Sequence, residues 1–327
     1  PAHADLPWPG FGLGIYAWTL QTYLRLTAAG LPCQLVPGLP EEGVVFVHSN
    51  VLQAERVFQP SPKRLIVSFK ADVLPGATAQ IQVVQNPQEA DARTHCYWLP
   101  HWPQPGLQPR HPQRGNQLQN VAFFGHINNL ADELASLDWK AALADLGLCW
   151  WPRLSGHHWS QQVDLPSNWH DYQEVDVIVA VRSFQVTDIR RTRNYGNKPA
   201  TKLYNAWLAG VPAILGSESA YRAERQSDLD FLEVNSLDDV LVALRRLQNE
   251  QGLYKAMVTN GLERAKAVSP EAIATRWLTF IETVVMPAYD CWRTQSQWQR
   301  TWQVGQQQLT ATRARIERKV RSHLFPA

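Results

Sequence analysis

The residues best suited to chemistry lie at the start of a predicted helix within the segment NKPATKLYNAWLAGVPAILG, residues 197–216. Pro199 suits a first helical turn, because the N–H groups of that turn have no partner inside the helix, and Gly210 is a typical helix terminator. Free N–H groups and the positive end of a helix attract anions, and lysines add charge. The segment therefore predicts a phosphate site formed by Lys198, Thr201, Lys202 and Asn205.

The same segment has a plainer interpretation. Val211–Leu215 reads as a short buried strand that directly follows the helix. A helix followed by such a strand occurs in any doubly wound α/β domain, whether or not it binds a ligand. The phosphate site is the favoured hypothesis, and an ordinary helix–strand unit is the alternative.

The segment also resembles the donor-binding region of glycosyltransferases with the GT-B fold. In many retaining members this helix carries two glutamates eight residues apart, and Asn197 and Asn205 occupy those places here. The T-K-L-x-N-A pattern is similar to the T-E-K-L-x-N-A stretch of α1,3-fucosyltransferases. On that comparison Lys202 matches the lysine that pairs with the nucleotide diphosphate, and Thr201 takes the place of the neighbouring acid.

The resemblance implies glycosyl transfer from a nucleotide diphosphate sugar to a hydroxyl of a carbohydrate, lipid or protein acceptor. It also implies that protein groups neutralise the diphosphate, so neither a metal nor another cofactor is expected. Two alternatives stay open. A nucleotide-sugar epimerase of the same fold would need an acid-rich sugar pocket, and a degenerate transferase would only bind a sugar or a partner.

A departing diphosphate needs positive groups fixed in advance. Arg182 is expected to orient it bidentately from the carboxyl end of the apolar strand 175–182, and Lys202 to supply charge. Backbone N–H groups near Gly125 would assist. Two sets of weaker candidates remain. Arg190, Arg191 and Arg193 lie in one loop and could equally be solvated surface residues. Gly12 and Gly14 form an N-terminal G-x-G sequence that could instead be a flexible loop.

An inverting transferase also needs a general base for the acceptor hydroxyl. His48 follows the apolar run 44–47, and His126 follows Gly125, so both are candidates. A hydrogen-bonded structural histidine is the commoner alternative for each. Asp5 and Asp72 are carboxylate options with no better support.

Composition limits the remaining classes. The chain has 327 residues, 45% of them apolar, and a formal net charge of +2, which gives no case for nucleic acid as a partner. The cysteines at 33, 96, 149 and 291 form no C-x-x-C pair, and no Walker-type loop or H-E-x-x-H helix is found. No segment is long and apolar enough to span a bilayer, so a cytoplasmic protein is expected.

The order of predicted elements indicates an α/β protein with two doubly wound, Rossmann-like domains facing each other across a cleft. The Pro- and Gln-rich stretch 100–115 marks the boundary, giving an acceptor-side domain at 1–115 and a donor domain at 116–285. Cys33–Val36 is expected to be a strand of the first domain.

A C-terminal helical segment, 286–327, is expected to return to the first domain, with a helix break at Met286-Pro287. Its end combines apolar residues at helical spacing with five basic ones, Arg313, Arg315, Arg318, Lys319 and Arg321. Such a helix can lie on an anionic membrane surface. The alternative is the solvated face of an ordinary packed helix.

Overall fold

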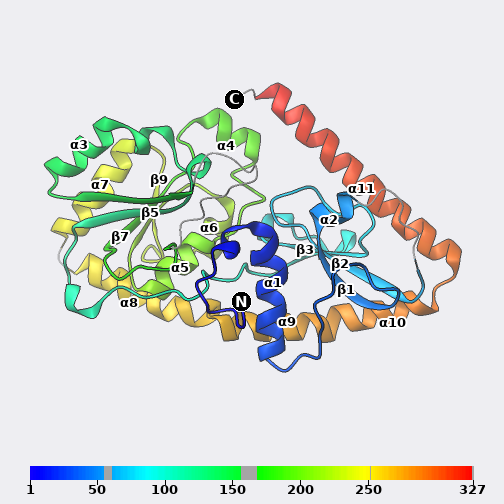
Figure 1. Cartoon of the computed structure of the whole chain (residues 1–327). Coiled ribbons are helices and arrows are strands. Elements are labelled where there is room, and N and C mark those ends of the chain that lie inside the picture. Colours follow the sequence, from blue (N-terminus) through cyan, green and yellow to red (C-terminus); the bar gives the residue numbers. More distant parts are fainter. Residues whose placement is uncertain (55–60, 156–167, 251, 326–327) are drawn as a thin grey trace. The chain divides into compact units, whose positions relative to one another are not determined.

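The computed structural model describes residues 1–54, 61–155, 168–250 and 252–325, and it consists of two compact α/β units (Figure 1). Unit 1 comprises Pro1–Gly12, Pro103–Tyr195 and Ala200–Ser269, and unit 2 comprises Leu13–Trp102, Gly196–Pro199 and Pro270–Ala327. The change of unit after Trp102 differs from the sequence-based boundary at residue 115. The first twelve residues and residues 270–285 also group differently from that prediction.

Unit 1 is built on a five-stranded parallel sheet with the strand order β6-β5-β7-β8-β9. Three of its strands, β5, β7 and β8, are buried apolar runs, as the sequence predicts, and β7 is buried at every position, whereas β6 and β9 are mostly half-buried. The strand order reverses between β5 and β7, which makes their carboxyl ends a switch point of a doubly wound sheet. The strands are β5 (Asn120–His126), β6 (Cys149–Ser155), β7 (Val177–Ala180), β8 (Ala213–Gly216) and β9 (Leu232–Val234).

The longer helices of unit 1 begin and end at recognisable signals. Helix α5 (Thr201–Ala209) ends at Gly210, whose φ of 68° favours glycine, and it packs against β7 and α8. A 3-10 turn, Asp132–Ala135, precedes α3 (Leu137–Asp145), which starts where Ser136 accepts a hydrogen bond from the Trp139 N–H. The others are α3 (Leu137–Asp145), α4 (Val186–Thr192), α6 (Ser219–Glu224), α7 (Leu237–Asn249) and α8 (Leu253–Ala265).

Unit 2 contains a four-stranded parallel sheet in the order β1-β2-β3-β4. The predicted strand at Cys33–Val36 is wrong: this segment has no regular structure, and Leu35 and Val36 are exposed without a strand partner. The elements are α1 (Gly14–Ala28), β1 (Gly43–His48), α2 (Ser49–Ala54), β2 (Arg64–Phe69), β3 (Ile81–Val84) and β4 (Cys96–Trp98).

The C-terminal helices, residues 270–324, pack within unit 2, whereas the sequence predicts that residues 270–285 belong to the donor domain. Trp277 of α9 (Pro270–Phe280) contacts the rings of Phe46 and Phe69, and Trp292 of α10 (Met286–Thr294) donates a hydrogen bond to the Ser61 carbonyl at 2.8 Å. These contacts fix the segment in the core of unit 2.

The predicted helix break at Met286-Pro287 is wrong. A π-helical turn, Ile281–Val285, precedes Pro287, and its wider turn accommodates the residue that lacks an N–H. The break lies at Gln295–Ser296, where Ser296 and Gln299 form a capping box that starts α11 (Gln297–Leu324). Within the part of the chain that the structure describes, no helix combines the length and apolarity needed to cross a membrane.

Candidate functional site

The carboxyl edge of the unit 1 sheet brings together several of the predicted phosphate ligands. Gly125 and His126 end β5, and Arg182 follows β7 by two residues, so they stand on either side of the switch point. Helix α5, which carries Thr201 and Lys202, packs against β7. Ligands of open α/β sheets bind at such an edge.

Lys202 and Gly125 are in direct proximity. The Lys202 Nζ lies 3.2 Å from the position that a Cβ atom on Gly125 would occupy, and 5.2 Å from the centroid of the Phe123 ring. Gly125 has a φ of 154°, which L side chains rarely adopt. The close approach of Lys202 and the backbone conformation therefore both favour glycine at position 125. Because glycine has no side chain, there is room for the Lys202 ammonium group beside it.

The start of α5 has no side-chain cap. Its N-cap residue is Ala200, which has no side chain to cap the helix, and the Thr201 Oγ1 is buried with no hydrogen-bond partner among the described residues. The first N–H groups of a helix have no intrahelical acceptor. This helix end can therefore still accept an anion beside Lys202.

Asn205, one turn further along α5, is used inside unit 1. Its side chain is buried, and its Oδ1 accepts a hydrogen bond of 2.9 Å from the Gln104 N–H. This hydrogen bond fixes the backbone at Gln104, just after the chain returns to unit 1 at Pro103. The amide holds protein backbone at the place where the resemblance puts a sugar-binding glutamate.

Arg182 is held by groups that the sequence did not indicate. Its Nε lies 3.0 Å from the carboxylate of Glu218, which is 2% exposed, and its Nη1 donates to the Asn129 side chain. Its guanidinium carbon also lies 5.8 Å from the Tyr195 ring centroid. Burial by itself lowers the pKa of Arg182, but Glu218 outweighs it and the pKa rises, so the ion pair is maintained.

Asn197 and Lys198 group with unit 2. The Lys198 Nζ forms a 2.5 Å ion pair with Asp72, and the Asn197 Nδ2 donates to the Asp72 carbonyl at 2.9 Å. Gln85 and Asn86, just after β3, donate to the main-chain carbonyls of Asn197 and Lys198. This segment is thus fixed to the carboxyl edge of the unit 2 sheet, and the charge of Lys198 is balanced by Asp72.

The two predicted bases share one geometry. In His48 the Nδ1 accepts a hydrogen bond from the Asn50 N–H at 3.2 Å, and in His126 the Nδ1 accepts one from the Asn128 N–H at 3.2 Å. A neutral imidazole in this arrangement carries its proton on Nε2. Burial lowers the pKa of His48, partly opposed by Asp72, so it is neutral at pH 7. Its Nε2 is therefore a donor and not a base.

His101, which the sequence did not indicate, has the opposite tautomer. Its Nδ1 lies 2.6 Å from the Trp102 carbonyl oxygen, which can only accept, so Nδ1 carries the proton and Nε2 keeps its lone pair. Burial lowers its pKa, with Asp72 again acting in the opposite direction. The sequence held one signal for it: His101 lies three residues after β4, at the same edge of the sheet where His48 ends β1.

The weaker candidates lie on elements other than α5, which carries Lys202. Arg190 and Arg191 are in the last turn of α4, where Arg191 pairs with Asp188, and Arg193 caps this helix with a φ of 55°. Gly12 ends a 3-10 turn of unit 1, whereas Gly14 begins α1 of unit 2. The segment predicted to be a loop with Arg190, Arg191 and Arg193 thus contains the short helix α4.

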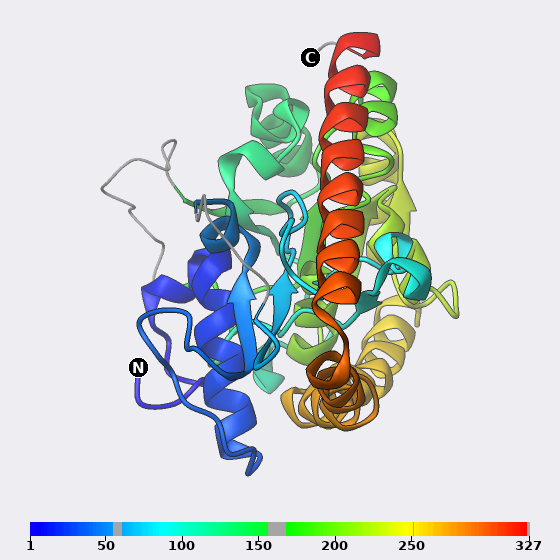
Figure 2. The same cartoon turned by 90° about the vertical axis from the view of Figure 1, so that its right-hand side faces the viewer.

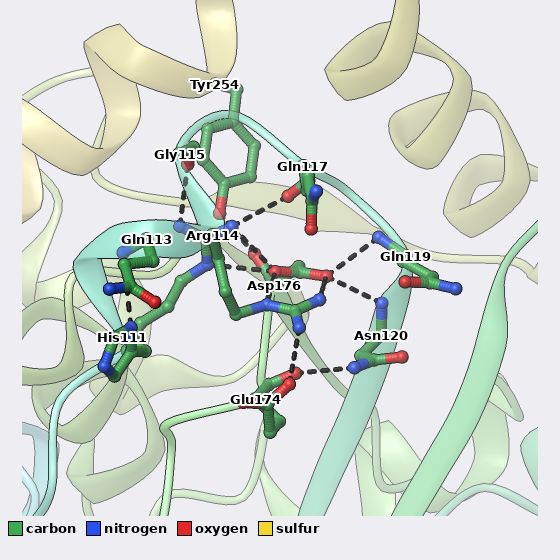
Figure 3. Close-up of polar contacts among 11 residues, drawn as sticks. His111, Gln113, Arg114, Gly115, Gln117, Gln119, Asn120, Glu174, Asp176 and Tyr254 are labelled. Carbon is green, nitrogen blue, oxygen red and sulfur yellow. Dashed lines mark hydrogen bonds and ion pairs between the residues drawn. The ribbon is translucent and has the colours of Figure 1, made fainter.

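The most extensive polar cluster of unit 1 lies at the opposite, amino end of β7 (Figure 3). Asp176 is fully buried and pairs with Arg110 at 2.7 Å and Arg114 at 2.6 Å, and it accepts hydrogen bonds from the Gln119 and Asn120 N–H groups. Every carboxylate oxygen has partners. The cluster fastens the Pro- and Gln-rich stretch 103–119 to the sheet, so its role is structural.

The described residues contain no group of three or more His, Cys, Asp or Glu side chains that could hold a metal ion. The carboxyl edge of the unit 1 sheet carries the basic side chains Lys202 and Arg182.

Comparisons with known proteins give a fold but no sequence family. No protein-family model matches the chain, and no curated protein matches its sequence. Sucrose-phosphate synthase from Thermosynechococcus elongatus is similar in structure, with a TM-score of 0.50, 14% identity, and coverage of 75% of this chain and 74% of that one.

Two further solved structures align over more of this chain but less of their own length. TarM gives a TM-score of 0.47 at 8% identity, with 80% of this chain and 58% of TarM covered. The pneumococcal O-GlcNAc transferase GtfA, solved with UDP and GlcNAc, gives 0.47 at 11% identity, with 80% and 60% covered. The likeness to sucrose-phosphate synthase shows the fold, because two α/β units with C-terminal helices are the GT-B fold.

Proposed function

We propose that this protein transfers a sugar from a nucleotide diphosphate sugar to an acceptor hydroxyl, and that unit 1 binds the donor. The observation that carries the proposal is the position of the Lys202 ammonium group beside Gly125, at the switch point of a doubly wound sheet. The uncapped start of α5 adds N–H donors to the same place.

Charge develops on the diphosphate as the bond to the sugar breaks. A lysine and helix N–H groups that are already in place stabilise this charge without reorganising in the transition state. Under this proposal Lys202 supplies positive charge, and the ion pair with Glu218 holds Arg182 in position at the end of β7 to orient the diphosphate. In this scheme no metal ion is needed to neutralise the leaving group.

An acceptor hydroxyl must lose its proton during transfer. Within unit 2, we assign the role of proton acceptor to His101 in preference to His48, because only His101 keeps a lone pair on Nε2 when neutral. The acceptor itself is a carbohydrate, lipid or protein hydroxyl.

A binding protein without catalysis is the second candidate. It is favoured by Asn205, whose amide holds the Gln104 backbone where retaining GT-B enzymes carry a glutamate. Such a protein would bind the donor and leave it intact.

Calorimetry separates these functions when followed by a turnover assay. The parent is titrated with UDP and GDP, and with uridine and guanosine as controls that lack phosphates. The corresponding nucleotide sugars are then incubated with the protein, and released diphosphate is measured. Binding with slow release supports the transferase. Binding without release supports the binding protein, and the absence of binding to any diphosphate overturns both.

A further inference from the structure

Helix α11, the long orange-to-red helix of Figure 2, carries a row of exposed apolar residues on one face, called here the apolar stripe. Trp298 is 86% exposed and Trp302 is 68% exposed, and four aliphatic residues further along the helix expose about half of their surface or more. At 3.6 residues per turn these six positions fall within an arc of about 80°. The stripe consists of Trp298, Trp302, Leu309, Ile316, Val320 and Leu324.

The opposite face of the same helix is the buried one. Arg300, Val304 and Gln307 are each less than 10% exposed, and the helical period places them roughly across from the stripe. An ordinary surface helix buries its apolar face and exposes its polar one. In α11 an arginine and a glutamine are buried while two tryptophans face outward, so the stripe calls for a partner of its own.

The charge near the stripe indicates the kind of partner. The last third of α11 carries five basic residues between Arg313 and Arg321 and a single acid, Glu317. Arg313, Arg315, Arg318 and Lys319 are exposed, and none of them forms an ion pair with another described side chain. A strongly basic helix with an apolar stripe and tryptophans matches an anionic lipid surface.

A second copy of this chain fits the stripe poorly. Two helices that pair as a coiled coil need apolar residues at alternating spacings of three and four. Trp302, Leu309 and Ile316 supply one such set, but the residues three positions after them are Gly305, Thr312 and Lys319. The seam would lack half of its contacts and would place basic groups of both copies close together.

We propose that α11 lies along the surface of an anionic phospholipid membrane. The apolar stripe enters the boundary between headgroups and acyl chains, and the basic residues that the helical period places within or beside the stripe, Arg313, Lys319 and Arg321, contact the lipid phosphates. This inference is independent of the proposed sugar transfer, because it depends only on α11.

Vesicle sedimentation tests this proposal with the full chain. The protein is mixed with vesicles of phosphatidylcholine alone, or of phosphatidylcholine with phosphatidylglycerol, at low and high salt. We expect binding to the anionic vesicles and its loss at high salt. Replacing both Arg313 and Lys319 by alanine should weaken binding about 30-fold, at roughly tenfold per 1.4 kcal/mol and about 1 kcal/mol per basic residue near the surface. Replacing Trp298 and Trp302 by alanine should weaken it about tenfold or more.

Matched controls come from unit 1. Lys140→Ala with Arg245→Ala removes two exposed basic residues, and Leu137→Ala removes an exposed apolar one, so neither control should change vesicle binding. Equal thermal melts show that all variants are folded. The proposal is overturned if the parent does not bind anionic vesicles, or if the α11 variants bind as the parent does. It is also overturned if the parent ignores lipid and forms a dimer that Trp302→Ala dissociates.

Discussion

The Lys202 Nζ lies 3.2 Å from where a Cβ atom on Gly125 would stand, so the end of β5 and the start of α5 share one small space. A methyl group at Gly125 would displace the ammonium group and would also meet the Phe123 ring at 3.2 Å. We expect Gly125→Ala to weaken nucleoside diphosphate binding about tenfold or more, because a charge-assisted contact is worth about 1.5–3 kcal/mol.

The control for this variant is Gly38→Ala, since a Cβ at Gly38 meets nothing within 4 Å. Calorimetry with UDP and GDP compares the two variants with the parent. Unchanged affinity in Gly125→Ala would show that the ligand does not depend on this space.

The buried pair of Arg182 and Glu218 should be important for stability. Glu218→Gln leaves the Arg182 charge buried without its counter-ion, which costs about 3–5 kcal/mol. Arg222→Ala breaks the more exposed pair of Arg222 and Glu233 and should cost about 1 kcal/mol or less. Urea unfolding measures both, and equal effects would argue against a buried ion pair.

The lowered pKa of Asp176 predicts how the free energy of unfolding depends on pH. Burial tends to raise its pKa, but the hydrogen bonds from Arg114, Asn120, Gln119 and Arg110 outweigh burial, and the pKa lies below the ordinary value of 3.8. Protonation is therefore harder in the folded chain than in the unfolded one. The stabilisation from Asp176 is fully present above the unfolded pKa and is lost as the pH falls through the folded pKa.

Asp176→Asn removes this contribution and leaves two arginines without their shared carboxylate. We expect a loss of about 3–5 kcal/mol at pH 7, which shrinks as the pH is lowered below 4. The fully exposed Asp228, changed to asparagine, is the matched control and should alter the free energy of unfolding by about 0.5 kcal/mol or less. A constant difference between parent and Asp176→Asn across this pH range would be inconsistent with the ion cluster.

NMR spectroscopy can determine the tautomers of His48 and His101 directly. In ¹⁵N-labelled protein at pH 7, His101 should carry its proton on Nδ1 and His48 on Nε2, and both should titrate below 6.5. The variants His101→Asn and His48→Asn assign the two sets of signals. If His101 proves to be protonated on Nε2, it cannot serve as the proton acceptor.

Much of the architecture could be predicted because it depends on local patterns. The buried strands β1, β2, β5 and β7 are continuous apolar runs, and α5 lies between a proline and a glycine. Cys33–Val36 has the same kind of pattern but finds no neighbouring strand to pair with. The sequence does not show which runs meet a partner.

The site was predictable only in part, for a similar reason. Gly125 and Lys202 could be proposed from glycine and helix signals. The partners of Arg182 and Lys198, by contrast, are Glu218 and Asp72, which are distant in sequence and become neighbours only when strand ends align. The protonated nitrogen of His101 depends on a single carbonyl.

Calorimetry of Lys202→Ala tests the central claim most directly. The parent, Lys202→Ala and the exposed control Lys140→Ala are titrated with UDP and GDP and with the matching nucleosides. If Lys202 contacts the diphosphate, Lys202→Ala should bind the diphosphate roughly 10- to 150-fold more weakly, with nucleoside binding unchanged and Lys140→Ala equal to the parent. Equal diphosphate affinity in all three proteins would contradict the account and remove the donor site from α5.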